Sequence, residues 1–392
     1  MTFTLRTVST WSAITAATLF LVACGGSGDD DGPPGSTQGP AVETISAVLD
    51  GDQEAPQRIA SVANGSATFS LERSTRTLSG TVTVDGVTPS VAHIHAGAPG
   101  VAGPIALPLS VHPGGARLAP TVLSTEQLAQ LDEGALYINV HSTTHPSGEI
   151  RGQLGREVFV AELGAAQEVA PTQVVSSASG VGRLVLNPVT RALSGELELS
   201  GIEATAAHIH SAPVGQNGPI VINLEDHGGH GHFTVPENTV LNEAQVKTLR
   251  GGGLYLNVHS ATHPGGEIRG QVGRRVRVAV ASGRQEVPAN GSTASGRAFF
   301  AYGLADRSLQ GRLTLSGMNA TAAHLHQAPA GVNGPIAVNL EQNPADAEVW
   351  TLAPGVTLSP SQAEALLADG LYVNAHSAAF AAGEVRGQLL AR

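Results

Sequence analysis

Cysteine is nearly absent from this 392-residue chain, in which Cys24 stands alone. A lone cysteine excludes an internal disulfide, and a free thiol would be a liability in an exported protein. Methionine is almost as scarce, with Met1 and Met318 only, which argues against copper handling by thioether ligands. Aromatic residues make up 4% of the chain, and together with 48 glycines this favours light, turn-rich β structure.

Positive charge and long apolar runs are also scarce. The chain has 21 Lys and Arg against 32 Asp and Glu, a formal net charge of -11, and no basic stripe that could neutralise phosphates. We therefore expect no nucleic-acid partner. No stretch after residue 24 is apolar enough to cross a membrane. A Ser-His-Asp elbow, a phosphate loop and a dinucleotide fingerprint are missing from the sequence, so it assigns no enzymatic activity.

The first 42 residues have the pattern of an export and anchoring segment. A short N-terminal segment that carries Arg6, followed by an apolar stretch, predicts a signal peptide over residues 1–23. Its end, Leu-Val-Ala before Cys24, resembles the lipobox of bacterial lipoproteins, whose cysteine becomes the lipidated first residue of the mature chain. Residues 24–42 would then be the lipidated cysteine and a flexible linker. The resemblance implies a lipid anchor in the bacterial cell envelope, and Gly25 is compatible with an outer membrane where the host has two membranes.

The rest of the chain repeats one pattern three times. The pattern runs Ala-His-x-His, Gly-Pro-Ile, Leu-Tyr-x-Asn-x-His-Ser and Gly-Glu-x-Arg-Gly-Gln, and its first histidine is His93, His208 or His324. A period of about 115 residues is longer than a solenoid repeat and matches a whole small domain, which can bury its own core. We therefore predict three tandem domains, at residues 43–156, 157–274 and 275–392.

Each copy combines alternating β-type runs with one short helical segment. Runs such as Leu78 to Val84 recur at roughly ten-residue spacing, which is typical of an antiparallel sandwich or barrel. Capping signatures at Ser124, Asn242 and Ser359 predict a structural helix before each Leu-Tyr motif. We expect these helices to end at glycines, namely Gly134, Gly251 and Gly370.

The order of these motifs resembles the CHRD domain, a module named after chordin and also found in bacterial secreted proteins. The resemblance covers about residues 43 to 392, in three copies. It implies an extracellular location and a mainly β fold of three tandem immunoglobulin-like antiparallel β-sandwich domains, each with one short helix. It brings no agreed enzymatic activity. Chordin sequesters a growth factor, and a bacterial lipoprotein has no reason to share that partner.

Eleven of the 15 histidines lie in the repeated motifs. Residues two apart on a strand point to one face, so each His-x-His pair can reach one ligand, and the later Asn-x-His strand can add a third imidazole. Such a cluster suits copper or zinc. A fourth histidine follows in the first two copies, and Phe380 takes its place in the third. The candidate ligands are His93, His95, His141 and His145, then His208, His210, His259 and His263, then His324, His326 and His376.

Other interpretations of these residues stay open. The histidines can hydrogen-bond within a loop-rich end of the sheet without metal, and triplication alone would copy them. The spacing loosely resembles copper/zinc superoxide dismutase, which leaves a copper-dependent oxidoreductase as an alternative. A zincin-type helix is excluded by Pro146 and Gly148. Glu149 and Arg151 are expected to form structural charge pairs with each other or with the Gln-Glu of the first strand.

The sequence therefore predicts an exported, lipid-anchored binding or scaffold protein. Copper or zinc is the cofactor that the histidines suggest, and an unidentified protein or glycan is the expected partner. A metal-free adhesion or structural role on the cell surface is the remaining alternative. In any of these roles, linked modules would gain avidity where several bind at once.

Overall fold

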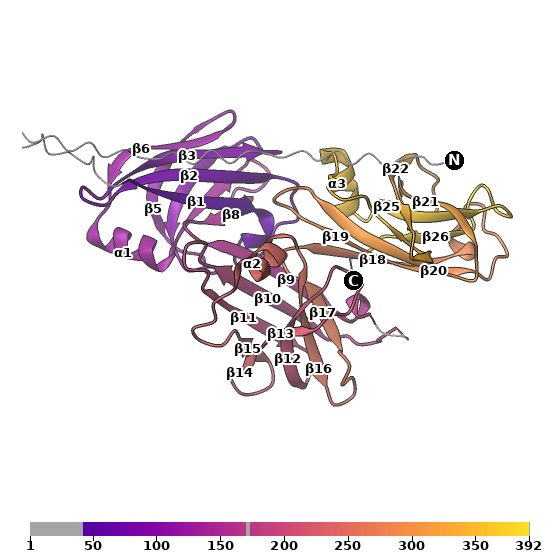
Figure 1. The fold of residues 1–392 in the computed structure, drawn as a ribbon. Coiled ribbons are helices and arrows are strands. Elements are labelled where there is room, and N and C mark those ends of the chain that lie inside the picture. Colours follow the sequence, from indigo (N-terminus) through magenta and orange to yellow (C-terminus); the bar gives the residue numbers. More distant parts are fainter. Residues whose placement is uncertain (1–41, 170–172, 392) are drawn as a thin grey trace, which may run out of the picture. The chain divides into compact units, whose positions relative to one another are not determined.

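The computed structural model describes residues 42–169 and 173–391, which form three antiparallel β domains with one α-helix each (Figure 1). The predicted signal peptide and the predicted lipidation site at Cys24 lie outside the described residues. Within the described part, no helix is long and apolar enough to cross a membrane.

The first domain is a closed β-barrel. Its strands pair in the order β1-β2-β3-β6-β5-β4-β7-β8, and the pairing of Asp50 with Arg151 joins β1 to β8 and closes the circle. The elements are β1 (Val42–Asp50), β2 (Asn64–Glu72), β3 (Thr77–Asp85), β4 (Val91–Ala96), β5 (Ile105–His112), β6 (Gly115–Val122), α1 (Thr125–Glu133), β7 (Leu136–His141) and β8 (Ile150–Gln153).

The strands of the second domain pair in the same order as those of the first, but the sheet does not close into a barrel. Its nine strands pair in the order β13-β12-β16-β17-β9-β10-β11-β15-β14. The elements are β9 (Glu157–Gly164), β10 (Ser179–Leu186), β11 (Leu193–Ser200), β12 (Ala204–Ser211), β13 (Ile220–Asn223), β14 (Glu225–Asp226), β15 (His232–Thr234), α2 (Glu243–Arg250), β16 (Leu254–Ser260) and β17 (Ile268–Gln271).

The third domain repeats the second, with the strand order β22-β21-β25-β26-β18-β19-β20-β24-β23. The elements are β18 (Arg275–Ser282), β19 (Ser295–Tyr302), β20 (Leu309–Ser316), β21 (Ala320–Gln327), β22 (Ile336–Asn339), β23 (Glu341–Asn343), β24 (Asp346–Thr351), α3 (Pro360–Leu367), β25 (Leu371–Ser377) and β26 (Val385–Gln388).

The mainly β architecture with one helix in each domain is confirmed, but the two-sheet arrangement is not. The family resemblance implies immunoglobulin-like sandwiches, whereas hydrogen bonds join all strands of a domain into one continuous sheet. In every domain the first strand pairs with the last, through Asp50 and Arg151, Gly164 and Arg269, or Ser282 and Arg386. Such a pairing across the expected gap between two sheets is non-local and leaves no mark in the local alternation of residues.

All three helices begin as predicted, with capping boxes at Ser124, Asn242 and Ser359. In each box the N-cap side chain accepts from a backbone N–H one turn on, which satisfies a donor that the helix itself leaves free. The first two helices end at Gly134 and Gly251 as expected. The third ends earlier than predicted, at the C-cap Ala368, because Asp369 already adopts a left-handed φ of 55° before Gly370.

Alternation along the strands separates the apolar core of each domain from a polar outer face. In β4, Ala92 and Ile94 are fully buried in the core, so His93 and His95 must point to the opposite face. The same alternation operates in β7, where Ile138 and Val140 enter the core. This division places the repeated histidines together, outside the hydrophobic core.

Candidate metal centres

Two neighbouring strands carry the histidines of the first domain. Strands β4 and β7 pair antiparallel, so that His95 lies opposite Tyr137 and His93 lies opposite Asn139. His141 lies at the end of β7, on the same face as these residues because it is two positions beyond Asn139. The motif His-x-His on one strand and the motif Tyr-x-Asn-x-His on its neighbour therefore place three histidines together on one face of the sheet.

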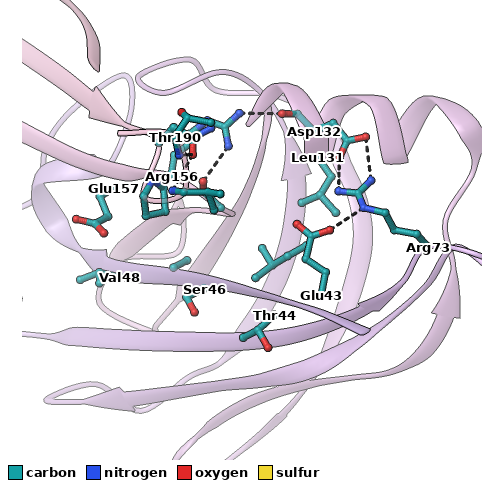
Figure 2. Close-up of a pocket in the computed structure, with 16 residues that line it drawn as sticks. Glu43, Thr44, Ser46, Val48, Arg73, Leu131, Asp132, Arg156, Glu157 and Thr190 are labelled. Carbon is teal, nitrogen blue, oxygen red and sulfur yellow. Dashed lines mark hydrogen bonds and ion pairs between the residues drawn. The ribbon is translucent and has the colours of Figure 1, made fainter. Parts of the chain in front are cut away.

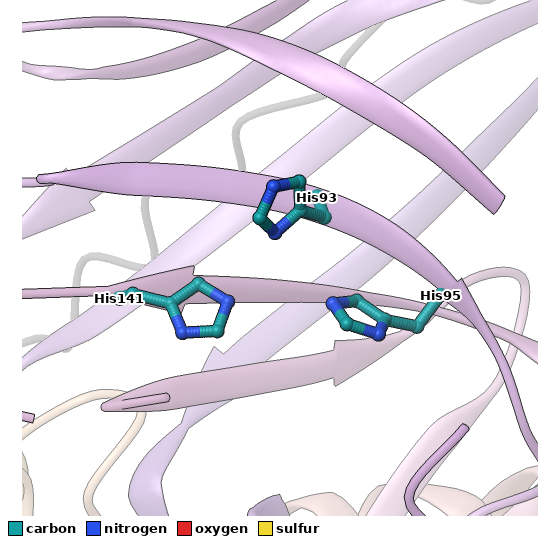
Figure 3. Close-up of side chains that lie close together, drawn as sticks. All are labelled: His93, His95 and His141. Atoms are coloured by element: carbon teal, nitrogen blue, oxygen red, sulfur yellow. The ribbon is translucent and has the colours of Figure 1, made fainter. Parts of the chain in front are cut away.

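The imidazoles of His93, His95 and His141 face one another (Figure 3). One ring nitrogen from each lies within 4.8 Å of the other two. The ring centroids are 5.5 Å apart for His93 and His95, 5.4 Å for His93 and His141, and 6.2 Å for His95 and His141. Three nitrogens that converge in this way can bind one metal ion.

Backbone carbonyls determine which ring nitrogen of His95 and His141 is free to bind a metal ion. The Nδ1 of His95 lies 2.9 Å from the carbonyl oxygen of Gly103, and the Nδ1 of His141 lies 3.0 Å from that of Pro146. A carbonyl only accepts, so in both neutral rings Nδ1 carries the proton and Nε2 keeps its lone pair. An outer hydrogen bond of this kind is the usual support of a metal-binding histidine.

The three converging nitrogens have no other partner. His93 Nδ1, His95 Nε2 and His141 Nε2 are shielded from solvent and make no hydrogen bond in the structure. Buried polar atoms without a partner are rare, and each carries a desolvation penalty. A metal ion at the centre of the cluster would remove all three penalties together.

The surroundings of His93 and His141 favour the neutral imidazole, which is the form that binds metal. Burial lowers the pKa of His93, and the neighbouring His95 lowers it further. Burial also lowers the pKa of His141, and this outweighs the opposite effect of the hydrogen bond to Pro146. Protons therefore compete less for the nitrogens of His93 and His141 than for those of an exposed histidine.

The second domain repeats this arrangement with His208, His210 and His259. The centroid separations are 5.6 Å for the pair on β12, 4.9 Å for His208 and His259, and 6.3 Å for His210 and His259. Nδ1 of His210 lies 2.9 Å from Gly218 O, and Nδ1 of His259 lies 3.0 Å from Pro264 O. The same three kinds of nitrogen are again without partners.

The third domain forms an equivalent cluster from His324, His326 and His376. Here the Nδ1 of His324 lies 3.3 Å from the Nε2 of His376. Two nitrogens bound to one zinc ion at tetrahedral angles would be about 3.3 Å apart, given metal–nitrogen bonds of about 2.0–2.1 Å. Backbone oxygens of Gly334 and Ala381 lie 2.9 and 3.1 Å from Nδ1 of His326 and His376, as in the other copies.

The predicted fourth ligands are not part of these clusters. His145 Nδ1 lies 3.4 Å from the Oε2 of Glu149 and 3.2 Å from the hydroxyl of Thr144. His263 Nδ1 lies 3.4 Å from Glu267 in the same way. Phe380 in the third copy thus replaces a residue of the loop and leaves its three-histidine cluster complete.

Behind each cluster lies a stack of side chains that the sequence pattern did not predict. The ring of Tyr137 lies parallel to that of His95, at a centroid distance of 5.0 Å and an interplanar angle of 15°. The Cζ of Arg151 lies 3.5 Å from the centroid of the tyrosine ring. Arg151 comes from β8 and His95 from β4, on opposite sides of β7, so the tyrosine lies between them. The recurrence of Tyr and Arg in all three motifs was the available signal.

Arg151 differs from its predicted role in a charge pair with Glu149. Its guanidinium donates to the carbonyl oxygens of Val101 and Ala98, at 3.0 and 2.8 Å, while Glu149 accepts from Ser61 at 2.6 Å. The glutamate of the first Gln-Glu, Glu54, is the nearby carboxylate, and Arg151 lowers its pKa while burial raises it more, to about 7. The Arg151 side chain is 1% exposed.

Other features of the first two domains lie apart from the clusters. Figure 2 shows a surface pocket in which Arg73 is bonded to Glu43 at 2.7 Å and to Asp132 at 2.9 Å. In the second domain, His227 and His230 of the Gly-rich loop contact Thr234 and Asp226. Within the described residues, the groups able to hold a metal ion are the three histidine clusters.

Fold and site together define a class: repeated antiparallel β domains that each carry three converging imidazoles outside the core. The CHRD domain family matches residues 45–154, 159–272 and 277–389, one segment inside each predicted domain. Because these segments cover most of the sequence, the chain belongs to the CHRD domain family, in three tandem copies. No curated protein and no solved structure matched the chain significantly.

Proposed function

We propose that the chain is an exported, lipid-anchored scaffold whose three CHRD domains each hold one copper or zinc ion. The observation that carries the proposal is the convergence of three imidazole nitrogens in each domain. In the first two domains all three are buried without a hydrogen-bond partner, and in the third the Nε2 of His326 is. A purely structural histidine would direct its ring nitrogens to hydrogen-bond partners. Here the second and third histidine of each cluster use one nitrogen for a backbone carbonyl and leave the other facing the cluster.

The test is elemental analysis of the chain, purified without a histidine tag and loaded with copper or zinc. We expect about three tightly held ions per chain, one for each cluster. Changing His93 and His95 to alanine should remove one of them and leave the far-ultraviolet circular dichroism unchanged. His145→Ala is the matched control, because this histidine lies outside the cluster, and it should keep the full metal content.

Two outcomes would overturn the proposal. No retained metal in the unaltered chain would leave the histidines structural and would direct the search to protein or glycan partners. An unchanged metal content after the double substitution would show that the ions bind elsewhere, for example at the Gly-rich loop that contains His227 and His230.

A further inference from the structure

The donor set of each cluster is electrically neutral. Three imidazoles converge, and among the described residues no carboxylate belongs to the cluster. A bound ion therefore keeps its full charge in a partly desolvated site. The free-energy cost of an unneutralised charge rises steeply with its size, so this donor set penalises a doubly charged ion more than a singly charged one.

A fixed positive charge lies behind the cluster and increases that penalty. The Arg151 guanidinium, stacked on Tyr137, is separated from the ligand His95 by a single aromatic ring. It cannot swing away without losing its bonds to Ala98 O and Val101 O. Burial lowers the pKa of Arg151 to about 10, which leaves it charged at neutral pH.

The same stack of arginine, tyrosine and histidine side chains is present in the second and third domains. Arg269 Cζ lies 3.4 Å from the centroid of Tyr255, which stacks on His210 at 4.9 Å. The third copy has Arg386 at 3.5 Å from Tyr372, which stacks at 4.9 Å on its own cluster histidine. A buried cation would be a poor choice behind a site meant for a divalent ion, because like charges repel strongly where the dielectric constant is low.

The number of metal-binding nitrogens also favours a singly charged ion. Structural zinc takes four ligands in a tetrahedral arrangement, whereas each cluster supplies three. In the first two clusters the donor nitrogens are shielded from solvent, as is the Nε2 of His326 in the third, which leaves little access for a water molecule as the fourth ligand. The cuprous ion carries a single charge, has no ligand-field preference and accepts a trigonal set, and imidazole is a suitable ligand for copper.

We propose that each three-histidine cluster selects Cu(I) over Cu(II) and Zn(II), and that the arginine behind the Tyr ring is the residue that sets this preference. The inference rests on the proposed metal-binding function and specifies the ion. Arg151, Arg269 and Arg386 act through the ligand histidine and do not touch the metal, so they are positioning residues.

The first experiment compares the three ions on the unaltered chain. Cu(I) is titrated anaerobically against bicinchoninate, and Cu(II) and Zn(II) are titrated against chelators of known affinity. We expect Cu(I) to bind most tightly, at about three ions per chain. Equal or tighter binding of Zn(II) or Cu(II) would overturn the inference and leave the proposed function standing. Failure of all three ions to bind would overturn both.

The second experiment removes the positive charge of Arg151. In a chain left with only the first cluster by His208→Ala and His324→Ala, Arg151→Met should shift the ratio of Cu(II) to Cu(I) affinity towards Cu(II) by about tenfold. Arg151→Lys keeps a cation and should retain most of the preference. Arg73→Met removes a guanidinium that pairs on the surface and is the control, with no expected change.

A structural role alone would weaken the binding of both oxidation states equally. An unchanged affinity ratio in Arg151→Met would therefore contradict the assignment of the preference to the arginine. If Arg151→Met does not fold, the titrations of the unaltered chain still decide whether the cluster selects Cu(I). Arg151→Lys then tests whether a positive charge at this position is enough to keep the preference.

Discussion

The fold changes the charge state of the buried glutamate in each Gln-Glu motif. Glu54 is 4% exposed, and the amide of Asn139 donates to it at 3.2 Å. Its Oε1 and the Oδ1 of Asn139 both lie buried without a partner. A proton on the carboxyl would supply the missing donor, and burial accordingly raises the pKa of Glu54 to about 7.

This arrangement predicts a loss of stability as pH rises. Burial raises the pKa of Glu168 to about 7 and that of Glu286 to about 6, as in the first copy. Between the unfolded value of about 4.3 and these folded values, the folded chain binds more protons than the unfolded chain, so the free energy of unfolding falls as pH increases. The fall should amount to about 1–3 kcal/mol for each carboxyl.

The combined variant Glu54→Gln, Glu168→Gln and Glu286→Gln should reduce this dependence. The buried Asp50, whose pKa burial raises to about 7, contributes with the same sign and remains in the variant. Thermal unfolding at pH 5 and pH 8 measures the dependence: the unaltered chain should lose more of its Tm over this interval than the variant. Glu133→Gln, at an exposed position, is the control and should behave as the unaltered chain does. Equal losses in the triple variant and the unaltered chain would contradict the assignment.

At the residue scale, the sequence predicts the cluster and not its surroundings. The spacing of His93, His95 and His141 is sufficient because strand alternation places them on one face. The stack of Tyr137 and Arg151 depends on side-chain packing across three strands, which no local pattern encodes. The same holds for His145, whose ring the loop turns towards Glu149.

At the scale of single elements, the turn before the last strand of each domain is held by a glycine. Gly266 has a φ of 128°, and a Cβ there would lie 2.7 Å from the Oδ1 of Asn257 and 2.8 Å from the Oε1 of Glu168. Gly265, its neighbour, has nothing within 4 Å of the corresponding position. The two glycines therefore carry different constraints although they are adjacent.

This contrast predicts that Gly266→Ala is destabilising and Gly265→Ala is close to neutral. We expect the first substitution to cost more than about 1 kcal/mol, through backbone strain and the displaced carboxylate, and the second to change stability by less than about 0.5 kcal/mol. Chemical denaturation of the two variants compares them. Similar stability of both would show that the turn adapts and that Asn257 and Glu168 can move aside.

The elements also show where local prediction ends. The helix starts at Ser124, Asn242 and Ser359 follow from capping chemistry within four residues. Closure of the first sheet depends on eight residues of β5, Ile105–His112, which continue far enough to reach β6. In the second domain the corresponding run is interrupted after Asn223, and its continuation β14 pairs with β15, which follows β11 in the pairing order as β6 follows β3. Such a difference in pairing is set by the whole domain.

At the scale of the whole molecule, the proposed lipid anchor separates the folded domains from the membrane by the linker at residues 24–42. Because Cys24 is the only cysteine, one substitution tests the anchor without affecting any other thiol. Cys24→Ser should abolish labelling by radioactive palmitate in cells and move the chain from the membrane fraction to the soluble exported fraction. Persistent membrane association without label would point to a protein partner as the anchor.

The hydrogen bonds that orient the second and third histidine of each cluster end on main-chain oxygens. This determines how readily mutation can change the cluster. A side-chain acceptor can be deleted by one codon change, but a peptide carbonyl survives every substitution that preserves the loop. The residue behind the third histidine is Pro146 in one copy, Pro264 in another and Ala381 in the last, yet each presents its oxygen at 3.0 to 3.1 Å. After triplication, the loops can thus diverge in sequence while the orientation of the ligands is inherited unchanged.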